Sequence, residues 1–511
     1  MDLRQLFPPQ LPPIILTAME QLPPASVEQP TSSTEAPSEN SNLCDVCQGF
    51  DVAELLAQAE GQASTAMLTA LDGDHNEEME FKAGIPLFFE HQKSLKSLKE
   101  SADHGCALCS LIWKCWSDSR GRSATVDKAI DDSGQGQVFF GTSGYNISKA
   151  EMPLITVTQR PDGHSSRTLC TFDVYAERSE STPFSNLVTE YNLLLDSSIR
   201  KVSNSIGTPV AFHSDTEECR VAAMEWFQEC HAHHPQCGPS KLFRRPTRLI
   251  NVGSTGEPPR LEIEQIPDSV YWVALSYCWG GDSEFKLRSE TFQGLKDGIL
   301  LEDWPATLRD AIKITRSLGL EYIWIDAQCI MQDSESDWAA EAARMQDVYS
   351  GAAVTIIASE SPSTGAGIYA PRPLTTYMPC PILFKKSTEE QSTVWLRPSI
   401  RNAVDLSYTD PVQSRGWTLQ EGLLAPRTLS FHKDQMIWEC SQYRMKESGH
   451  IIQLDHLFDS KDLFHNRNRR SKSALAYQKL QFGLLKQMSI LETHKSRLGW
   501  LPKYMVSSGV S

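Results

Sequence analysis

Short apolar runs alternate with amphipathic helical patterns in the middle of the chain. Apolar residues fill positions 271–277, 322–325 and 353–358, and each run has a length suited to a buried strand. Residues 307–318 place apolar side chains at helical spacing between the first two runs, and residues 336–349 do so between the last two. The alternation predicts an α/β core in which a mostly parallel sheet is flanked by helices.

The remaining sequence predicts three further regions. Residues 1–42 are rich in Pro, Ser, Thr and Glu, which predicts a disordered tail. Residues 43–245 contain short strand patterns and a helix that begins near Asp215, and they predict a mixed α+β region that bears zinc. We expect the core domain to span residues 246–440 and a divergent or truncated segment to span residues 441–511.

Composition and charge exclude several classes of protein. The 511 residues carry a net charge of -16, whereas proteins that bind nucleic acid gather Lys and Arg on one face. No apolar run approaches the roughly 20 residues of a membrane span, and the first residues lack the pattern of a secretory signal. Thirteen cysteines in such a chain indicate thiols and metal ligands rather than disulfides. We therefore expect a cytoplasmic protein.

Two Cys-x-x-Cys pairs predict a structural zinc site in the N-terminal region. The four thiols belong to Cys44, Cys47, Cys106 and Cys109. Each pair can place two thiolates on one ion, and four thiolates complete a closed tetrahedral shell. His91 and His104 are the substitutes if one of the cysteines is not a ligand. The alternatives are thiols that pack in a helix core and, more weakly, a redox dithiol.

A second group of metal-binding residue types follows the expected helix at Asp215. Cys230, His234 and Cys237 are close enough in sequence to share an ion, but a fourth ligand is not evident. We therefore favour ordinary thiols at a half-buried helix end.

Several segments of the core resemble the fungal heterokaryon-incompatibility (HET) domain. They are residues 274–280 (ALSYCWG), 320–330 (LEYIWIDAQCI), 345–349 (MQDVY) and 415–421 (RGWTLQE). The Cys pairs and the run that ends at Cys237 also resemble the usual N-terminal part of such proteins. The resemblance therefore covers most of residues 43–440.

This resemblance implies a role in fungal non-self recognition and in programmed cell death after unlike hyphae fuse. The implied partners are other incompatibility or signalling proteins, or copies of the same chain. HET domains are also distantly similar to TIR domains, which have a flavodoxin-like fold and some of which cleave NAD with a helical glutamate. The chain departs from the family pattern at Ala327 and Gln328, where Ser-Leu is usual, and after residue 445, where the customary continuation fades.

Polar and aromatic residues gather where the three core strands are expected to end. Cys278, Trp279, Gly280 and Asp282 follow the first, Asp326 and Cys329 the second, and Ser359 and Glu360 the third. Ligands of open parallel sheets bind beyond the carboxyl ends of the strands, so the set predicts a pocket for an aromatic, hydroxyl-rich ligand. Equally, Trp279 and Trp324 would belong to the core, and Asp326 would cap the next turn.

Two glutamates are further candidates. Glu341 lies at the flank of the apolar stripe of the helix expected over residues 336–349, where partial desolvation would suit a catalytic carboxylate. The competing interpretation is an ion pair with Arg344. Glu421 lies one turn from Trp417 on an expected helix and would either close over the strand ends or lock that helix onto the sheet through Arg415 or Arg427.

Three functions remain open at this point. The first is a nucleotide-consuming effector that cleaves NAD, with Glu341 as the catalytic carboxylate and Asp326 and Trp279 shaping the pocket. The second is a non-enzymatic module that acts by self-association or docking. The third is a hydrolase with a nucleophilic Cys278 or Cys329, which is disfavoured because no His lies near either in sequence.

Overall fold

The structure is a computed structural model. It describes residues 42–55, 87–119, 137–143, 154–160, 167–175, 207–234, 237, 244–267, 269–281, 284–372, 379–385, 391–399, 410–414, 421–422, 424–449 and 451–453. The expected tail therefore lies outside the described residues except for Asn42, and the expected C-terminal segment lies outside them beyond residue 453.

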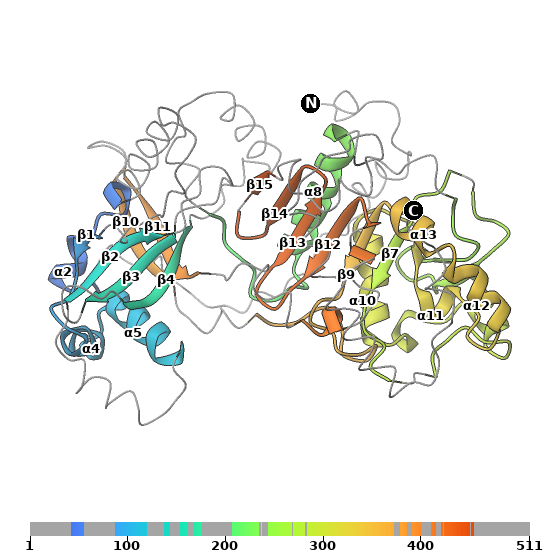
Figure 1. Cartoon of the computed structure of the whole chain (residues 1–511), viewed down its shortest axis with the longest axis horizontal. Coiled ribbons are helices and arrows are strands. Elements are labelled where there is room, and N and C mark those ends of the chain that lie inside the picture. The colour runs from blue at the N-terminus through green and yellow to red at the C-terminus, as the bar shows by residue number, and fades with distance from the viewer. Residues whose placement is uncertain are drawn as a thin grey trace, which may run out of the picture.

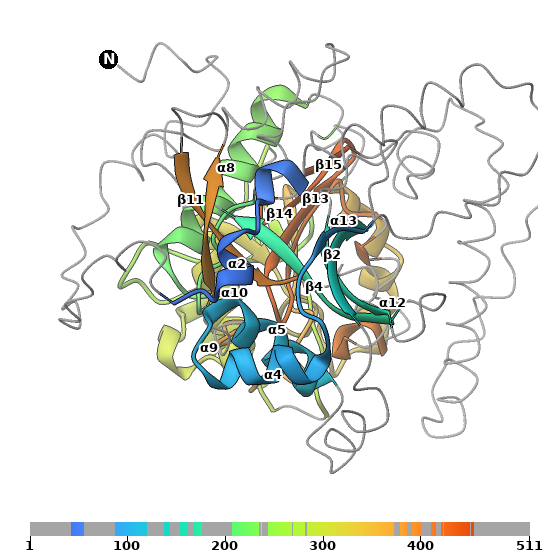
Figure 2. The ribbon, with the colours of Figure 1, turned by 90° about the vertical axis from the view of Figure 1, so that its left-hand side faces the viewer.

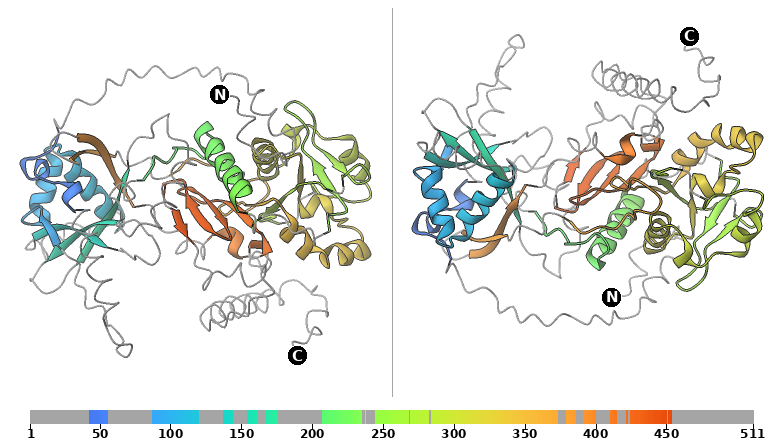
Figure 3. Two further views of the ribbon diagram at one scale, coloured as in Figure 1. Left: turned by 90° about the horizontal axis from the view of Figure 1, so that it is seen from above. Right: turned by 90° about the horizontal axis from the view of Figure 1, so that it is seen from below.

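The described strands form two sheets, which lie at opposite ends of the molecule together with their helices (Figures 1 and 3). The smaller sheet has the order β1-β2-β3-β4-β11-β10, and every neighbouring pair is antiparallel. Its strands are β1 (Leu87–Glu90), β2 (Gln137–Ser143), β3 (Leu154–Arg160), β4 (Arg167–Tyr175), β10 (Cys380–Lys385) and β11 (Gln391–Pro398).

Helices α2 (Asp45–Gln48), α4 (Leu95–Asp103) and α5 (Ala107–Ser119) pack against the smaller sheet (Figure 2). Val138 and Phe140 alternate with less buried neighbours on β2, as expected for a strand with one face toward a core. They form a single apolar cluster with Leu98 of α4 and Ile112 of α5. The helices thus bury the apolar face of the antiparallel sheet.

The larger sheet has the order β15-β14-β13-β12-β9-β7-β8-β5-β6. Its strands are β5 (Leu249–Asn251), β6 (Arg260–Glu262), β7 (Val273–Ser276), β8 (Tyr322–Trp324), β9 (Val354–Ile357), β12 (Arg427–Phe431), β13 (Met436–Cys440), β14 (Tyr443–Lys446) and β15 (Ile451–Gln453). The three apolar runs read from the sequence are therefore strands β7, β8 and β9, which lie side by side.

The prediction of a mostly parallel sheet is wrong. Among the described strands, the pairs β12–β9, β9–β7 and β7–β8 are parallel, while the flanks of the larger sheet and all of the smaller one are antiparallel. Parallel neighbours need a long crossover, such as the segment with α10 (Ala306–Ser317) between β7 and β8. Strands joined by short turns, such as β12 and β13, pair as antiparallel hairpins instead.

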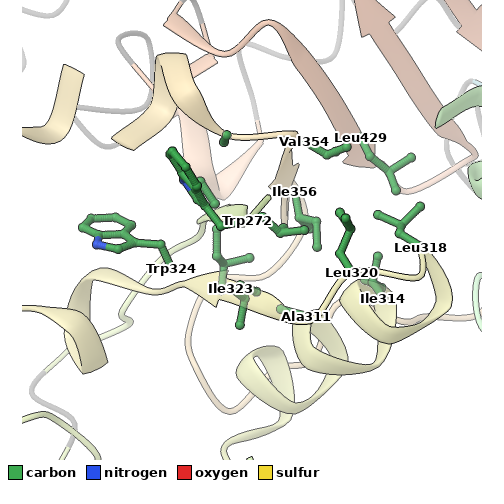
Figure 4. Close-up of a cluster of buried hydrophobic side chains, with 14 of the residues drawn as sticks. Trp272, Ala311, Ile314, Leu318, Leu320, Ile323, Trp324, Val354, Ile356 and Leu429 are labelled. Atoms are coloured by element: carbon green, nitrogen blue, oxygen red, sulfur yellow. The ribbon is translucent and has the colours of Figure 1, made fainter. Parts of the chain in front are cut away.

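Helices cover both faces of the parallel strands. Ile323 and Trp324 are consecutive on β8 and so point to opposite faces of the sheet. Ile323 lies toward α10, whose Ala311 and Ile314 are buried against the strands (Figure 4). The ring of Trp324 meets Tyr349 of α13 (Met345–Gly351) edge to face at 5.8 Å between centroids. This two-sided burial gives the region its α/β character.

The single helix expected over residues 336–349 is two helices. α12 (Glu335–Ala342) begins at the N-cap Ser334 and is followed after Ala343 by α13. The expected apolar stripe is also wrong, because Trp338 is 40 % exposed and the buried side chain of α12 is that of Glu341. The side chain of α12 that points to the protein interior is therefore the carboxylate of Glu341, and the indole of Trp338 is exposed.

The two sheets interleave in sequence. Strands β10 and β11 come from the range expected for the core domain, but β11 pairs with β4 of the smaller sheet. Helix α8 (Glu217–His233), from the range expected for the N-terminal region, packs in the core of the larger sheet. Division of the chain at residue 245 therefore does not coincide with the division between the two sheets.

A short segment joins the two sheets. The Gly207 amide donates to the Val174 carbonyl of the smaller sheet at 2.8 Å, and Arg397 of β11 donates to the Thr208 carbonyl at 3.0 Å. The Thr208 amide donates in turn to the Ser448 carbonyl beyond β14 at 2.9 Å. Residues 207–208 thus contact both halves of the molecule.

Candidate functional site

The first Cys cluster consists of Cys44, Cys47, Cys106 and Cys109. Cys44 and Cys47 lie at the start of α2, and Cys106 and Cys109 lie at the start of α5. Their sulfur atoms all lie within 4.8 Å of one another. Sulfur–sulfur distances are 4.0 Å for Cys44–Cys109 and 3.6 Å for both Cys47–Cys109 and Cys47–Cys106. Folding therefore brings both Cys-x-x-Cys pairs to one point.

These distances fit a tetrahedral zinc site. A zinc–sulfur bond of about 2.3 Å gives a tetrahedral sulfur–sulfur edge of about 3.8 Å. A disulfide would require about 2.0 Å, and all four cysteines are free thiols. Three of the four are buried, and Cys44 is half-buried, so the shell is closed as in a structural rather than a catalytic site. The residues present fit zinc.

His91 and Gln92 surround this cluster from the end of β1. His91 Nε2 lies 3.0 Å from Cys47 Sγ, and Gln92 Nε2 donates to Cys109 Sγ at 3.7 Å. Burial lowers the pKa of His91 to about 4, so at neutral pH its ring is uncharged and one ring nitrogen carries the only proton. His104, the other expected substitute, is exposed and contacts the Glu100 carbonyl. His91 is thus the histidine of the cluster.

The strand-end site, which we define as Trp279, Asp326 and Lys286, lies at the carboxyl ends of β7 and β8. The Trp279 indole donates to Asp326 Oδ2 at 3.0 Å and to Oδ1 at 3.2 Å. Lys286 Nζ lies 4.8 Å from the centroid of the same indole, within the range of a cation–π contact. An aromatic ring, a carboxylate and an ammonium group are thereby held together at the sheet edge where ligands of parallel sheets bind.

Lys286 is positioned by the residues at which the chain departs from the HET pattern. Gln328 Nε2 donates to the Phe285 carbonyl at 2.7 Å, and the Leu287 amide donates to the Ala327 carbonyl at 2.8 Å. These bonds fix the segment on either side of Lys286 to the short helix α11 (Asp326–Cys329). Sequence reasoning missed Lys286 because nothing in its local pattern indicates a neighbouring indole.

Gly280 permits the closest approach of another segment to the strand-end site. Its φ of 76° lies in the left-handed region, and a Cβ atom there would come within 2.0 Å of Ser363 Cβ. The Thr364 amide donates to the Trp279 carbonyl at 3.3 Å. Gly280 therefore serves backbone packing rather than supplying a functional group. Asp282 lies outside the described residues.

The two expected cysteines of the core, Cys278 and Cys329, are both buried. Cys278 is buried against Ile357 and Val412. Cys329 is fully buried, and this burial raises its pKa to about 12, so its thiol is protonated at neutral pH. Both thiols belong to clusters of buried apolar residues, and the charges of Arg248, Glu341 and Asp326 also act on Cys329.

Three polar residues, Glu360, Asp410 and His432, lie near the ends of β9 and β12, and the sequence indicated only Glu360. His432 Nδ1 lies 3.1 Å from a carboxylate oxygen of the buried Asp410. Burial and the charge of Asp410 raise the pKa of Glu360, which follows β9. Ser359, also expected at this edge, is buried. His432 and Asp410 were missed because they are remote in sequence from Glu360.

Glu421 contacts β7 rather than the strand-end site. Its Oε2 accepts a short hydrogen bond from the hydroxyl of Ser276, and its side chain is buried. Residues 415–420, which include Trp417, lie outside the described residues. The expected partners in a lock onto the sheet were Arg415, which lies outside the described residues, and Arg427; the described partner is Ser276.

Glu341 is held by two neighbours. The Thr247 hydroxyl donates to Glu341 Oε1 at 2.5 Å, and Arg344 Nη1 lies 3.8 Å from the same oxygen. The side chain is 4 % exposed. Glu341 and Asp326 both contribute to the electrostatic surroundings of Cys329. The expected pair with Arg344 is thus present, and Thr247 is a partner that the sequence did not indicate.

The second Cys/His cluster gains a fourth member in the structure. Cys440, at the end of β13, joins Cys230, His234 and Cys237, and their ligand atoms all lie within 4.8 Å of one another. The sequence offered only three residues because Cys440 is remote from the others along the chain. The expectation of a site without a fourth ligand is therefore wrong.

The fold and these sites define an α/β protein with two clusters of metal-ligating residues and a polar strand-end site. Residues 272–421 match the family model of the heterokaryon incompatibility protein (HET), a range that includes β7, β8, β9, Glu341 and Glu421. The match confirms, for residues 272–421, the resemblance to the HET domain that we read from the sequence. Searches of curated proteins and of solved structures gave no match. Among the described residues, no helix is long and apolar enough to cross a membrane.

Proposed function

We propose that this HET-domain protein is an effector of fungal non-self recognition that triggers programmed cell death through its strand-end site. The family match supports an incompatibility-type role. We place the protein in the cytoplasm and expect it to act with other incompatibility or signalling proteins or with further copies of itself. Its net charge of -16 does not favour nucleic acid as a partner.

The observation that carries the proposal is the pairing of Trp279 with Asp326 beside Lys286. An indole offers a stacking face to a base, and an ammonium group beside it attracts phosphate. This combination suits a nucleotide that carries an aromatic base, hydroxyl groups and phosphates.

NAD is the nucleotide that we propose for this site. Cleavage of its glycosidic bond gives the electron pair of that bond to nicotinamide, and water adds to the ribose carbon with release of a proton. A carboxylate stabilises the positive charge that develops on the ribose. Asp326 lies in the strand-end site itself, and Glu341, on α12, is the second candidate for this role.

A non-enzymatic signalling module is the second candidate function. The hydrogen bond from Thr247 and the ion pair with Arg344 occupy Glu341 in the way expected of a structural carboxylate. In that case the HET domain acts by binding a partner or another copy of itself. A Cys-dependent hydrolase is the least supported function, because burial keeps the Cys329 thiol protonated.

NAD consumption by the purified, zinc-loaded full chain at high concentration tests the proposal. We expect the wild type to release free nicotinamide from NAD. If Asp326 or Glu341 is the catalytic carboxylate, Asp326→Asn or Glu341→Gln respectively should lower the rate of nicotinamide release by at least about 100-fold. Trp279→Phe should raise KM more than it lowers kcat, because the ring persists but its bond to Asp326 is lost. Glu335→Gln, on the exposed side of α12, is the matched control and should keep wild-type activity.

The result without turnover is equally informative. If the folded wild type leaves NAD intact, NAD cleavage is excluded and the signalling module becomes the leading function. Overexpression toxicity that persists in Glu341→Gln but disappears in Trp279→Phe would then assign the strand-end site to partner binding. If Asp326→Asn, Glu341→Gln and Trp279→Phe all remain as toxic as the wild type, the strand-end site has no role in toxicity.

A further inference from the structure

Cys230, His234, Cys237 and Cys440 have the geometry of a metal shell. The distance from Cys440 Sγ to His234 Nδ1 is 3.6 Å. Zinc bonds of about 2.3 Å to sulfur and about 2.0 Å to nitrogen give a tetrahedral sulfur–nitrogen edge of about 3.5 Å. All four side chains are at least nine-tenths buried, so the shell is closed to solvent.

Donors around the sulfur atoms match those that stabilise metal-bound thiolates. The backbone amides of Gln442 and Tyr443 donate to Cys440 Sγ at 3.5 and 3.4 Å. The Cys237 thiol donates to the Ser441 hydroxyl at 3.5 Å, and this hydroxyl would donate to the sulfur once it is a thiolate. Donors of this kind orient ligands and offset negative charge on sulfur. The turn after β13 is thus shaped around two of the sulfur atoms.

A buried arginine provides the charge that such a site needs. Arg427 is 1 % exposed, and its Nε donates to Cys230 Sγ at 3.1 Å. Within the described part of the chain, no carboxylate lies in ion-pair contact with this guanidinium, whose further bond goes to the Ala353 carbonyl. A buried charge without a counter-charge is costly. Three thiolates, a neutral imidazole and Zn²⁺ together carry one net negative charge, which Arg427 offsets.

We propose that these four residues bind a second, structural Zn²⁺, which fastens α8 to β13. Cys230 and His234 belong to the end of α8, Cys237 follows it, and Cys440 ends β13. The ion would cross-link two segments far apart in sequence, so that its binding energy adds to folding of the larger sheet. It is distinct from the zinc site of Cys44, Cys47, Cys106 and Cys109, which lies in the other core cluster.

Metal content of the purified full chain tests this proposal without reference to any activity. Elemental analysis and native mass spectrometry should find two zinc ions per wild-type chain. Cys440→Ser and the double variant Cys47→Ser/Cys106→Ser should each retain one ion, whereas Cys115→Ser, at a helical thiol outside both clusters, should retain two. Arg427→Met should weaken zinc binding at the second site by about 10-fold or more.

Cobalt substitution separates the two sites even if Cys440→Ser fails to fold. Cys47→Ser/Cys106→Ser leaves only two thiols beside His91 at the first cluster, so after loading with Co²⁺ it should give the spectrum of the second site, with three sulfur ligands and one nitrogen. In the same background, His234→Cys should keep the metal and increase the sulfur-to-metal charge-transfer absorption. A folded, zinc-supplied Cys47→Ser/Cys106→Ser variant that holds no zinc overturns the proposal, as does a disulfide among Cys230, Cys237 and Cys440 in the freshly purified protein.

Discussion

Gly280 has a backbone conformation and a neighbour that together require the absence of a side chain. Its positive φ alone disfavours other residues, and the backbone of Ser363 and Pro362 would meet an added Cβ atom. The same residue follows Trp279, whose indole holds Asp326. The conformation at one glycine thus affects the strand-end site as a whole.

Gly280→Ala should therefore lower the free energy of unfolding by about 3 kcal/mol, with contributions from backbone strain and overpacking. Gly256→Ala is the control, because Gly256 has a φ of 92° but no atom within 4 Å of an added Cβ. Gly256→Ala should lower the free energy of unfolding by about 1 kcal/mol, because backbone strain is its only cost. Urea unfolding of both variants measures the difference, and equal losses would contradict the close contact with Ser363.

At the scale of elements, the first turns of α10 hold the segment that covers Gly280. Asp310 Oδ2 accepts from the backbone amides of Ile368 and Tyr369 at 2.9 and 3.3 Å. The Thr307 hydroxyl donates to the Ser363 carbonyl at 2.8 Å. A helix that packs in the core therefore also fixes the irregular segment over residues 363–369.

Asp310→Ala should detach that segment locally. The two amides would lose their acceptor, at a cost of about 1–3 kcal/mol. Hydrogen exchange at Ile368 and Tyr369 should accelerate by at least about 5-fold, while exchange in β9 stays unchanged. Asp310→Asn keeps an acceptor oxygen and should show a smaller increase. Unchanged exchange in Asp310→Ala would mean that the segment is held without this side chain.

At the scale of the whole molecule, the described residues form two large apolar clusters, one for each sheet. Each cluster adjoins one set of metal-ligating residues. Gly207 and Thr208 join the sheets through hydrogen bonds to Val174, Arg397 and Ser448. Two separate cores with a polar joint favour two units that unfold independently.

Cys106→Ser should therefore destabilise one unit and spare the other. Loss of one zinc ligand lowers metal affinity, and metal binding contributes directly to folding. Calorimetry should show two unfolding transitions, and in Cys106→Ser the Tm of one of them should be lower than in the wild type by at least about 5 °C. Cys115→Ser leaves the Cys cluster intact, so it should leave the Tm values of both transitions unchanged. A single transition that shifts as a whole would contradict the independence of the two cores.

The sequence by itself determined the features that depend on near neighbours along the chain. The apolar runs became β7, β8 and β9, the pattern at residues 307–318 became α10, and the Cys-x-x-Cys pairs came together at α2 and α5. Side-chain period and short ligand spacing are local properties, so they survive in any fold that buries the chain. Trp279 and Asp326 followed from the rule that parallel strands end at one edge.

Only the tertiary structure decided which distant segments meet. Cys440 completes the second Cys/His cluster, Lys286 reaches Trp279, and β11 pairs with β4 across more than half of the described chain. It also turned Glu341 inward toward Thr247. Such contacts depend on sheet order and on helix ends, which the free energy of the whole fold selects and no local pattern encodes.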